Sequence, residues 1–334
     1  RRTPDTHSAS DNASLIAMTS LDKIDRAQAV ATAPAPRHHL SLELSETLRL
    51  AVPMALTQLG QIAMMTTDLA FIGRLGNAAV ADAPLAGTVY FISFTIGMGL
   101  VSAVEPLAAQ AFGAREPRGI RRALRTGLWA GLLISLPIMP FSFSGEPILL
   151  ALGQAPTDAH LAQLYLFGLV WGVAPALWFM AVRGFMGAVN RPQPALWITL
   201  AAIPANALLA YLLIYGEWGF PRLALYGAGL ATSITNFVTL LAALWFAPRV
   251  RPFRNYHVLA KVWRIDWPLM RLLFAIGAPI SLSFMLEYGM FSTAALLMGL
   301  ISTLALAAHQ VALQVTAVLF MVPYGISQAA TVRV

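Results

Sequence analysis

The chain has no cysteine and few charged residues among its 334 positions. Without cysteine it contains no disulfide, no thiolate metal site and no cysteine nucleophile. Only 11% of the residues are charged and 58% are hydrophobic, which exceeds the apolar content of soluble domains. This composition predicts a membrane protein.

The sequence also lacks the short motifs that mark enzymes. It contains no HExxH metal motif, no GxSxG elbow and no GxxxxGK[ST] phosphate loop, and its six histidines are scattered. We therefore expect no enzyme, no metal, no cofactor and no ATP-driven transport by this chain alone. The net charge of +7 comes from short connections without a basic stripe interleaved with aromatics, so no nucleic-acid partner is expected.

Long apolar runs are what the sequence does contain. Eight of them approach the roughly 20 residues that a helix needs to cross a bilayer. They cover residues 50–72, 84–108, 126–143, 161–187, 195–215, 226–246, 272–299 and 304–330. The fold class predicted is all-α.

The connections between these runs alternate in charge. Twelve Arg and Lys residues lie in the connections after the second, fourth and sixth runs, whereas the opposite connections contain only Arg74 and Arg222. The positive-inside rule then places the amino terminus and the basic connections in the cytoplasm. We expect a multi-pass protein of the cell's inner (plasma) membrane.

An internal repeat at an offset of 226 residues divides the chain. Pro53 aligns with Pro279, and Gly73 with Gly299, without a gap. Both copies begin with a helix running in the same direction, so they predict two parallel lobes that face each other across a cavity. We expect a disordered extension over residues 1–45, a six-helix lobe over 46–246, a cytoplasmic linker over 247–270 and two helices of an incomplete second lobe over 271–334.

Two carboxylates inside the apolar runs are the first candidates for function, because a charge at the bilayer centre costs at least about 2.5 kcal/mol. Asp68 shares a helical face with Gln58, Gln61 and Met65. Glu287 lies one turn after Ser283, and the repeat places Gln61 at its equivalent position in the first copy. Such a carboxylate must be paired, protonated or bound to a cation. Alternatives remain open: Asp68 as an interfacial residue, and Glu287 in a structural interhelical hydrogen bond.

Other polar residues are weaker candidates. Asn206 lies beside Pro204, where either freed carbonyls help to coordinate a cation or substrate or Asn206 makes a structural bond between helices. Gln310 and Tyr324 belong to a polar stripe that is expected to face the second lobe or the cavity. Glu105 and Arg183 are both expected near cytoplasmic helix ends, where snorkelling or a local ion pair explains them, and Arg183 is expected at the periphery.

Several segments, in their order and spacing, resemble the multidrug and toxic compound extrusion (MATE) family. They are Leu50-Ala-Val-Pro, Thr67-Asp68-Leu-Ala-Phe-Ile-Gly73, Glu105-Pro-Leu-Ala-Ala-Gln-Ala-Phe-Gly113, Pro204-Ala-Asn206, Tyr226-Gly-Ala-Gly and Ala307-Ala-His309-Gln310. The resemblance covers nearly everything from about Leu48 onward.

The resemblance implies a twelve-helix, two-lobe antiporter that exports organic cations or other amphiphilic compounds in exchange for sodium or protons, of which about eight helices are present. It assigns the coupling ion to Glu287 and Asp68, with support or substrate contacts from Gln58, Gln61, Asn206, Ser283, Gln310 and Tyr324. A monomer in the lipid bilayer is expected. The alternative is a lipid-linked oligosaccharide flippase of the same superfamily, which needs a cationic central cavity.

Overall fold

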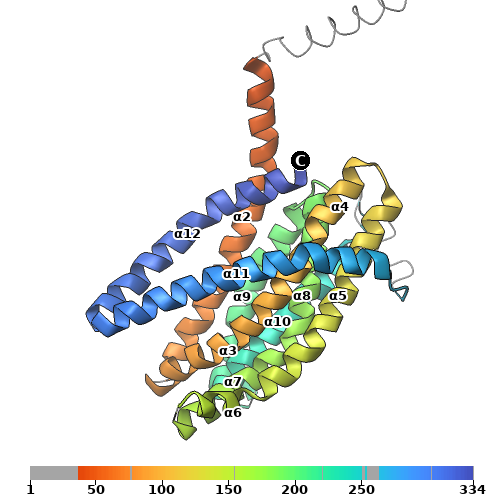
Figure 1. Cartoon of the computed structure of the whole chain (residues 1–334). Helices are drawn as coiled ribbons and strands as arrows, with labels where there is room; N and C mark the ends of the chain where they lie inside the picture. Colours follow the sequence, from red (N-terminus) through yellow and green to blue (C-terminus); the bar gives the residue numbers. More distant parts are fainter. Residues whose placement is uncertain are drawn as a thin grey trace, which may run out of the picture. The chain divides into compact units, whose positions relative to one another are not determined.

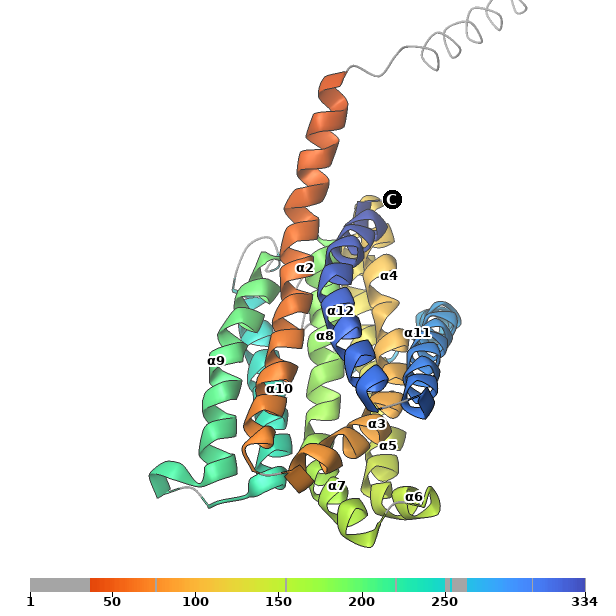
Figure 2. The same cartoon turned by 90° about the vertical axis from the view of Figure 1, so that its left-hand side faces the viewer.

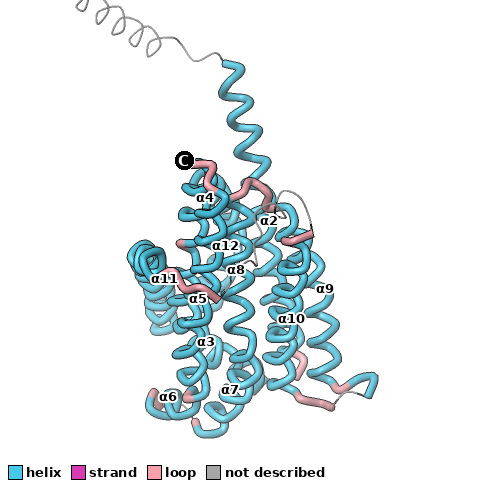
Figure 3. Tube along the Cα trace, turned by 90° about the vertical axis from the view of Figure 1, so that its right-hand side faces the viewer, coloured by secondary structure: helices cyan, strands magenta, loops and turns pink. Residues whose placement is uncertain are grey.

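The computed structural model describes residues 37–75, 77–153, 155–219, 221–249, 253, 263–301 and 303–333. Within this part all regular structure is helical (Figures 1 and 3). The chain divides into a unit over Arg1–Glu46 and a larger unit over Thr47–Val334. Of the first unit only the residues from Arg37 onward are described, and they form the beginning of helix α2 (Arg37–Gly73). The predicted extension therefore falls largely outside the described residues, and its last part is helical.

The other helices of the first repeat all belong to the larger unit. Each predicted apolar run corresponds to one helix or to two consecutive helices. After α2 they are α3 (Asn77–Ser102), α4 (Val104–Gly113), α5 (Pro117–Phe143), α6 (Gly145–Ala151), α7 (Pro156–Leu169), the 3-10 turn η1 (Val170–Gly172), α8 (Val173–Ala188), α9 (Gln193–Tyr215), the 3-10 turn η2 (Glu217–Gly219) and α10 (Ala224–Phe246).

The second repeat contributes α11 (Trp267–Ile301) and α12 (Thr303–Arg333). Seven helical segments of the described residues are long and apolar enough to cross a membrane. They include α11, most of α12 and every run predicted in the first repeat except that within α2. The predicted linker lies mainly outside the described residues, apart from its two ends and Phe253.

The largest apolar core joins α3, α4, α5, α8 and α10. Its members include Leu124, Leu177 and Phe185, which are all fully buried. Glycines allow close helix approaches around this core. A Cβ on Gly168 in α7 would lie 2.6 Å from the carbonyl oxygen of Tyr226 in α10, so glycine at this position allows the two helices to pack closely.

The two repeats contact each other through several helix pairs, among them α11 with α3, α11 with α5, α12 with α4 and α12 with α2. On α11 the hydroxyl of Ser281 donates to the carbonyl of Ile96 on α3 at 2.9 Å. One end of α12 packs on α2 through a buried cluster of Leu50, Ala51, Met54, Ala329 and Val332. Arg333 also donates a hydrogen bond to Thr47. Figure 2 shows α12 meeting α2 and α4 at this end. We call this end contact between α2 and α12 the repeat seam.

Candidate functional site

Asp68 of α2 is buried in the first repeat, with 6% of its surface exposed. Its Oδ1 accepts a hydrogen bond from the Asn206 amide of α9, and its Oδ2 accepts one from the Thr232 hydroxyl of α10 at 2.9 Å. The Thr235 hydroxyl in turn donates to the Asn206 carbonyl oxygen at 3.0 Å. Three helices thus converge on one carboxylate. We call these four residues the Asp68 cluster.

Local sequence explains how the cluster forms. Thr232 and Thr235 are three residues apart, so they share one face of α10. That face also has Ala228 and Ala231, which are buried and keep α10 close to its neighbours. Asn206 is completely buried on the side of α9 that faces α2. The cluster therefore sits where small residues let polar side chains meet inside an apolar lobe.

The chemistry of the cluster suits a proton or a hard cation. None of the salt bridges between described residues involves Asp68, and its hydrogen-bonding partners are neutral. Carboxylate, amide and hydroxyl oxygens are the donors that hard cations prefer. No group of three or more His, Asp or Glu residues suited to a metal ion occurs in the described part of the chain. One negative charge among neutral oxygens is suited to reversible neutralisation.

A second polar cluster surrounds Arg183 of α8. Its guanidinium donates to the side-chain oxygens of Gln58 at 2.9 Å and Gln61 at 3.3 Å, both on α2. Glu105 of α4 lies against Gly184 and Gly187 of α8 and interacts electrostatically with Arg183. Tyr324 of α12 interacts with Gln58, Arg183 and Glu105. These five residues form the Arg183 cluster, which joins the two repeats.

A small cavity lies within this cluster, between Glu105, Arg183 and Gln328 of α12. Its volume of about 20 Å³ accommodates roughly one water molecule. Charged and amide side chains line this cavity on several sides.

The prediction of a peripheral Arg183 is wrong. Depth along a helix was read from the sequence, but depth does not tell which side of the helix a residue occupies. Arg183 points inward to α2. The predicted common face on α2 is also divided: Gln58 and Gln61 face α8, Asp68 faces α9 and α10, and Met65 is 70% exposed. From Gln58 to Asp68 an α-helix falls about 80° short of three full turns. The two ends of the stripe therefore point in different directions.

The candidates of the second repeat lie apart from the Asp68 cluster. Glu287 is exposed on α11 and close enough to Tyr324 for an electrostatic interaction. The Ser283 hydroxyl is exposed and donates to the Pro279 carbonyl of its own helix at 2.9 Å. Gln310 lies in α12, and its side chain is outside the described part of the structure. The coupling role of Glu287 stays a prediction.

Sequence reasoning missed Thr232 and Thr235. Their spacing of three residues in an apolar run was a usable signal, because hydroxyls on one face of a membrane helix seek partners on neighbouring helices. Glu105 was assigned to a helix end, although its placement beside two glycines of α8 makes it part of the interior.

Comparison with known proteins adds an independent finding. The MatE family model matches residues 53–212 and 279–334. The chain is 66% identical over 95% of its length to a probable multidrug resistance protein NorM of Bradyrhizobium diazoefficiens, covering 68% of that protein. It is 60% identical over 91% of its length to a probable NorM of Rhodopseudomonas palustris, covering 64% of it. The chain thus spans about two thirds of the length of these relatives.

Solved structures share the fold. The eukaryotic MATE transporter AtDTX14 superposes with a TM-score of 0.76 at 19% identity, over 87% of this chain and 64% of that one. The MATE transporter NorM-NG, solved as a complex that includes a monobody, gives a TM-score of 0.67 at 27% identity, over 85% of this chain and 62% of that one.

Proposed function

Because the chain belongs to the MatE family of transporters, we propose that it is part of a secondary active antiporter that exports organic cations or other amphiphilic compounds in exchange for sodium or protons. The family consists of transporters and not of enzymes. The observation that carries the proposal is the Asp68 cluster, in which a buried carboxylate has only neutral hydrogen-bonding partners. Intramembrane ionisable residues of this kind mark ion pathways.

The proposed architecture is two parallel lobes with the linker between them. The two segments that match the family model begin at Pro53 and Pro279, which reproduces the offset of the internal repeat and supports this division. The lobes are those predicted, residues 46–246 and the helices from 271 onward. We place the protein as a monomer in the inner membrane, with the amino terminus and the basic connections in the cytoplasm.

The proposed mechanism is alternating access. Ion binding at Asp68 and at Glu287 shifts the balance between inward-open and outward-open arrangements through the difference in affinity for the two states. Asn206 supports the ion at Asp68, whereas Gln58, Gln61 and Tyr324 connect the repeats through Arg183. Ser283 and Gln310 retain their proposed place in the substrate cavity.

The interior position of Arg183 bears on the flippase alternative. A pyrophosphate site needs several uncompensated positive charges. Arg183 instead donates to Gln58 and Gln61 and lies beside the Glu105 carboxylate, which offsets its charge. The export of cationic compounds is therefore favoured.

The test is efflux of a cationic dye by the full-length protein, measured separately under sodium and proton gradients. We expect Asp68→Asn and Glu287→Gln each to reduce efflux under the coupling gradient by at least about tenfold, because a neutral side chain cannot exchange an ion. Thr232→Ser, which keeps the hydroxyl on Asp68, is the matched control and should retain most activity. Unchanged efflux under both gradients removes the substituted carboxylate from the mechanism.

A further inference from the structure

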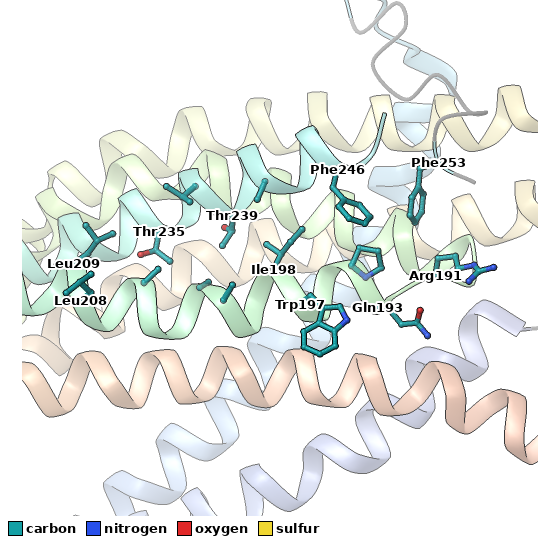
Figure 4. A pocket seen from close by; sticks show the side chains of 16 residues that line it. Arg191, Gln193, Trp197, Ile198, Leu208, Leu209, Thr235, Thr239, Phe246 and Phe253 are labelled. Atoms are coloured by element: carbon teal, nitrogen blue, oxygen red, sulfur yellow. The ribbon is translucent and has the colours of Figure 1, made fainter. Parts of the chain in front are cut away.

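A groove of about 780 Å³ runs between α9 and α10 (Figure 4). Small residues line it, namely Ala201, Ala202, Ala205 and Ala242. Larger apolar residues flank them, among them Trp197, Leu208 and Val238, all substantially exposed. The groove exists because alanines leave space between two helices whose neighbouring side chains are bulky.

The groove lies away from the carboxylate of the Asp68 cluster. Trp197, Ala201, Ala205 and Leu208 follow a spacing of four, four and three residues, so they form one face of α9. Asn206 is buried and directed to Asp68 on α2. An exposed apolar face on a membrane-spanning helix is in contact with lipid.

Polar groups line the groove mainly at one end. Arg191 and Gln193 lie there, beyond Trp197, and Figure 4 shows them together at the end opposite Leu208 and Leu209. Arg191 is exposed and belongs to a connection assigned to the cytoplasmic side by the charge pattern. The cytoplasmic leaflet carries anionic lipids that attract basic side chains near the membrane surface.

Beyond Arg191 and Gln193, the apolar part of the groove fits one leaflet. From Trp197 to Leu208 the helix rises about 17 Å at 1.5 Å per residue, and one leaflet occupies about 15 Å of a hydrocarbon core of about 30 Å. An acyl chain extending from a headgroup at Arg191 therefore ends near Leu208. A cationic compound is disfavoured, because the charged residue at the groove is an arginine.

We propose that the α9/α10 groove binds an anionic phospholipid of the cytoplasmic leaflet, with its phosphate at Arg191 and one acyl chain along the alanines. The groove also touches the ion site, since Thr235 lines it and donates to Asn206, the partner of Asp68. The bound chain therefore packs against Thr235, one hydrogen bond away from Asn206, the amide partner of Asp68. This proposal rests on the membrane placement of the helices and not on transport.

The experiment uses the full-length protein in phosphatidylcholine vesicles that contain brominated phosphatidylglycerol or brominated phosphatidylcholine at equal mole fraction. Bromine quenches nearby tryptophan fluorescence, and the signal of Trp197 is obtained as the difference between the parent and Trp197→Phe. We expect half-maximal quenching at a several-fold lower fraction of phosphatidylglycerol. Arg191→Gln should reduce this preference by roughly fivefold, the effect of one basic side chain at an anionic surface.

Two further variants sharpen the result. Arg249→Gln removes an exposed arginine at the same end of α10 that stacks on Trp245, 4.5 Å from its ring centre, and should keep the preference. Ala205→Phe fills the groove without adding a tryptophan and should weaken Trp197 quenching by both lipids. Equal quenching by the two lipids, a preference that survives Arg191→Gln, or displacement of the lipid by a cationic dye overturns the proposal. Absence of quenching by either lipid overturns it as well, because another part of the protein then covers the groove.

Discussion

Arg183 places a positive charge inside the larger unit, where its hydrogen-bonding partners are two amide oxygens. Glu105 supplies a compensating charge nearby. Each of these residues is costly to bury alone, because an uncompensated polar or charged group in a protein interior loses its hydration without recovering it. The effects of replacing Arg183 and Glu105 on the free energy of unfolding are therefore expected to depend on each other.

We expect Arg183→Gln to lower the free energy of unfolding by about 1–3 kcal/mol, because Glu105 loses its positive neighbour and the amides of Gln58 and Gln61 lose their donor. The double variant Arg183→Gln with Glu105→Gln should recover part of this loss, since no buried charge remains. Thermal unfolding of the purified protein measures both. Additive losses in the double variant contradict the linkage, and exposed Arg249→Gln should change stability by less than about 0.5 kcal/mol.

The sequence indicated which residues are unusual but not which ones meet. Asp68 and Asn206 were identified because polar side chains are rare in apolar runs. Their hydrogen bond joins positions 138 residues apart, and no periodicity within one helix predicts it. The predicted position of Arg183 was wrong for the same reason, because the direction of its side chain depends on the packing of α8 against α2. Single-residue chemistry is thus accessible from sequence, whereas pairing requires the fold.

At the scale of helices, eight apolar runs predicted the chain's course, but two of them are interrupted. The second run breaks at Ala103 and the fourth at η1, Val170–Gly172. Pro106 and Pro175 follow these breaks, and each proline leaves the carbonyl four residues earlier without its helical partner. Pro204 and Pro279 lie inside helices that continue past them. A proline by itself therefore does not predict whether a helix is interrupted.

Gly168 tests the packing of α7 on α10. We expect Gly168→Ala to lower stability by about 1–3 kcal/mol, because the added Cβ would lie 2.6 Å from the Tyr226 carbonyl oxygen and 2.7 Å from the Leu230 nitrogen. The matched control is Gly87→Ala in α3, where the Cβ meets no described atom within 4 Å. That change should be neutral or stabilising by up to about 1 kcal/mol, since alanine favours helix. Equal unfolding midpoints for the two variants would contradict the close approach.

The start of α11 is tied to α5 by a partly buried ion pair, in which the side chain of Arg122 is 52% exposed and that of Asp266 only 11%. Arg122 Nε donates to Asp266 Oδ2 at 2.5 Å, and this hydrogen bond lowers the pKa of Asp266. Arg125 lies 3.7 Å from the same Asp266 oxygen. A carboxylate with a lowered pKa stabilises the folded state above its unfolded pKa of about 3.9, and the contribution is lost as pH falls through the folded pKa.

We therefore expect Asp266→Asn to lower stability at neutral pH by about 0.2–1 kcal/mol, because solvent around the half-exposed Arg122 side chain screens the pair. The difference from the parent should shrink as pH is lowered from about 4, where the parent's own carboxylate becomes protonated. Unfolding curves recorded across this pH range provide the measurement. A difference that stays constant down to the lowest pH excludes the ionised pair as its cause.

At the scale of the whole larger unit, the repeat seam is the end at which α2 and α12 pack against each other. Leu50, Met54 and Val332 are buried there together, and the Arg183 cluster lies beside them. Toward the opposite end, residues of the same two helices, such as Met65 and Val311, are exposed. Under the proposed topology this packed end lies on the cytoplasmic side, so we propose that the arrangement is outward-open.

The absence of cysteine allows this assignment to be tested at one position. Ala329 is completely buried in the repeat seam, whereas its neighbour Ala330 is exposed at the same depth. In the full-length protein, a maleimide applied from the cytoplasmic side should label Ala330→Cys quickly and Ala329→Cys slowly. Adding dye and the coupling gradient should raise the rate at position 329 at least several-fold, because alternating access must separate α12 from α2 to open this end. If turnover leaves position 329 as protected as before, the seam is a permanent contact and the repeats alternate elsewhere.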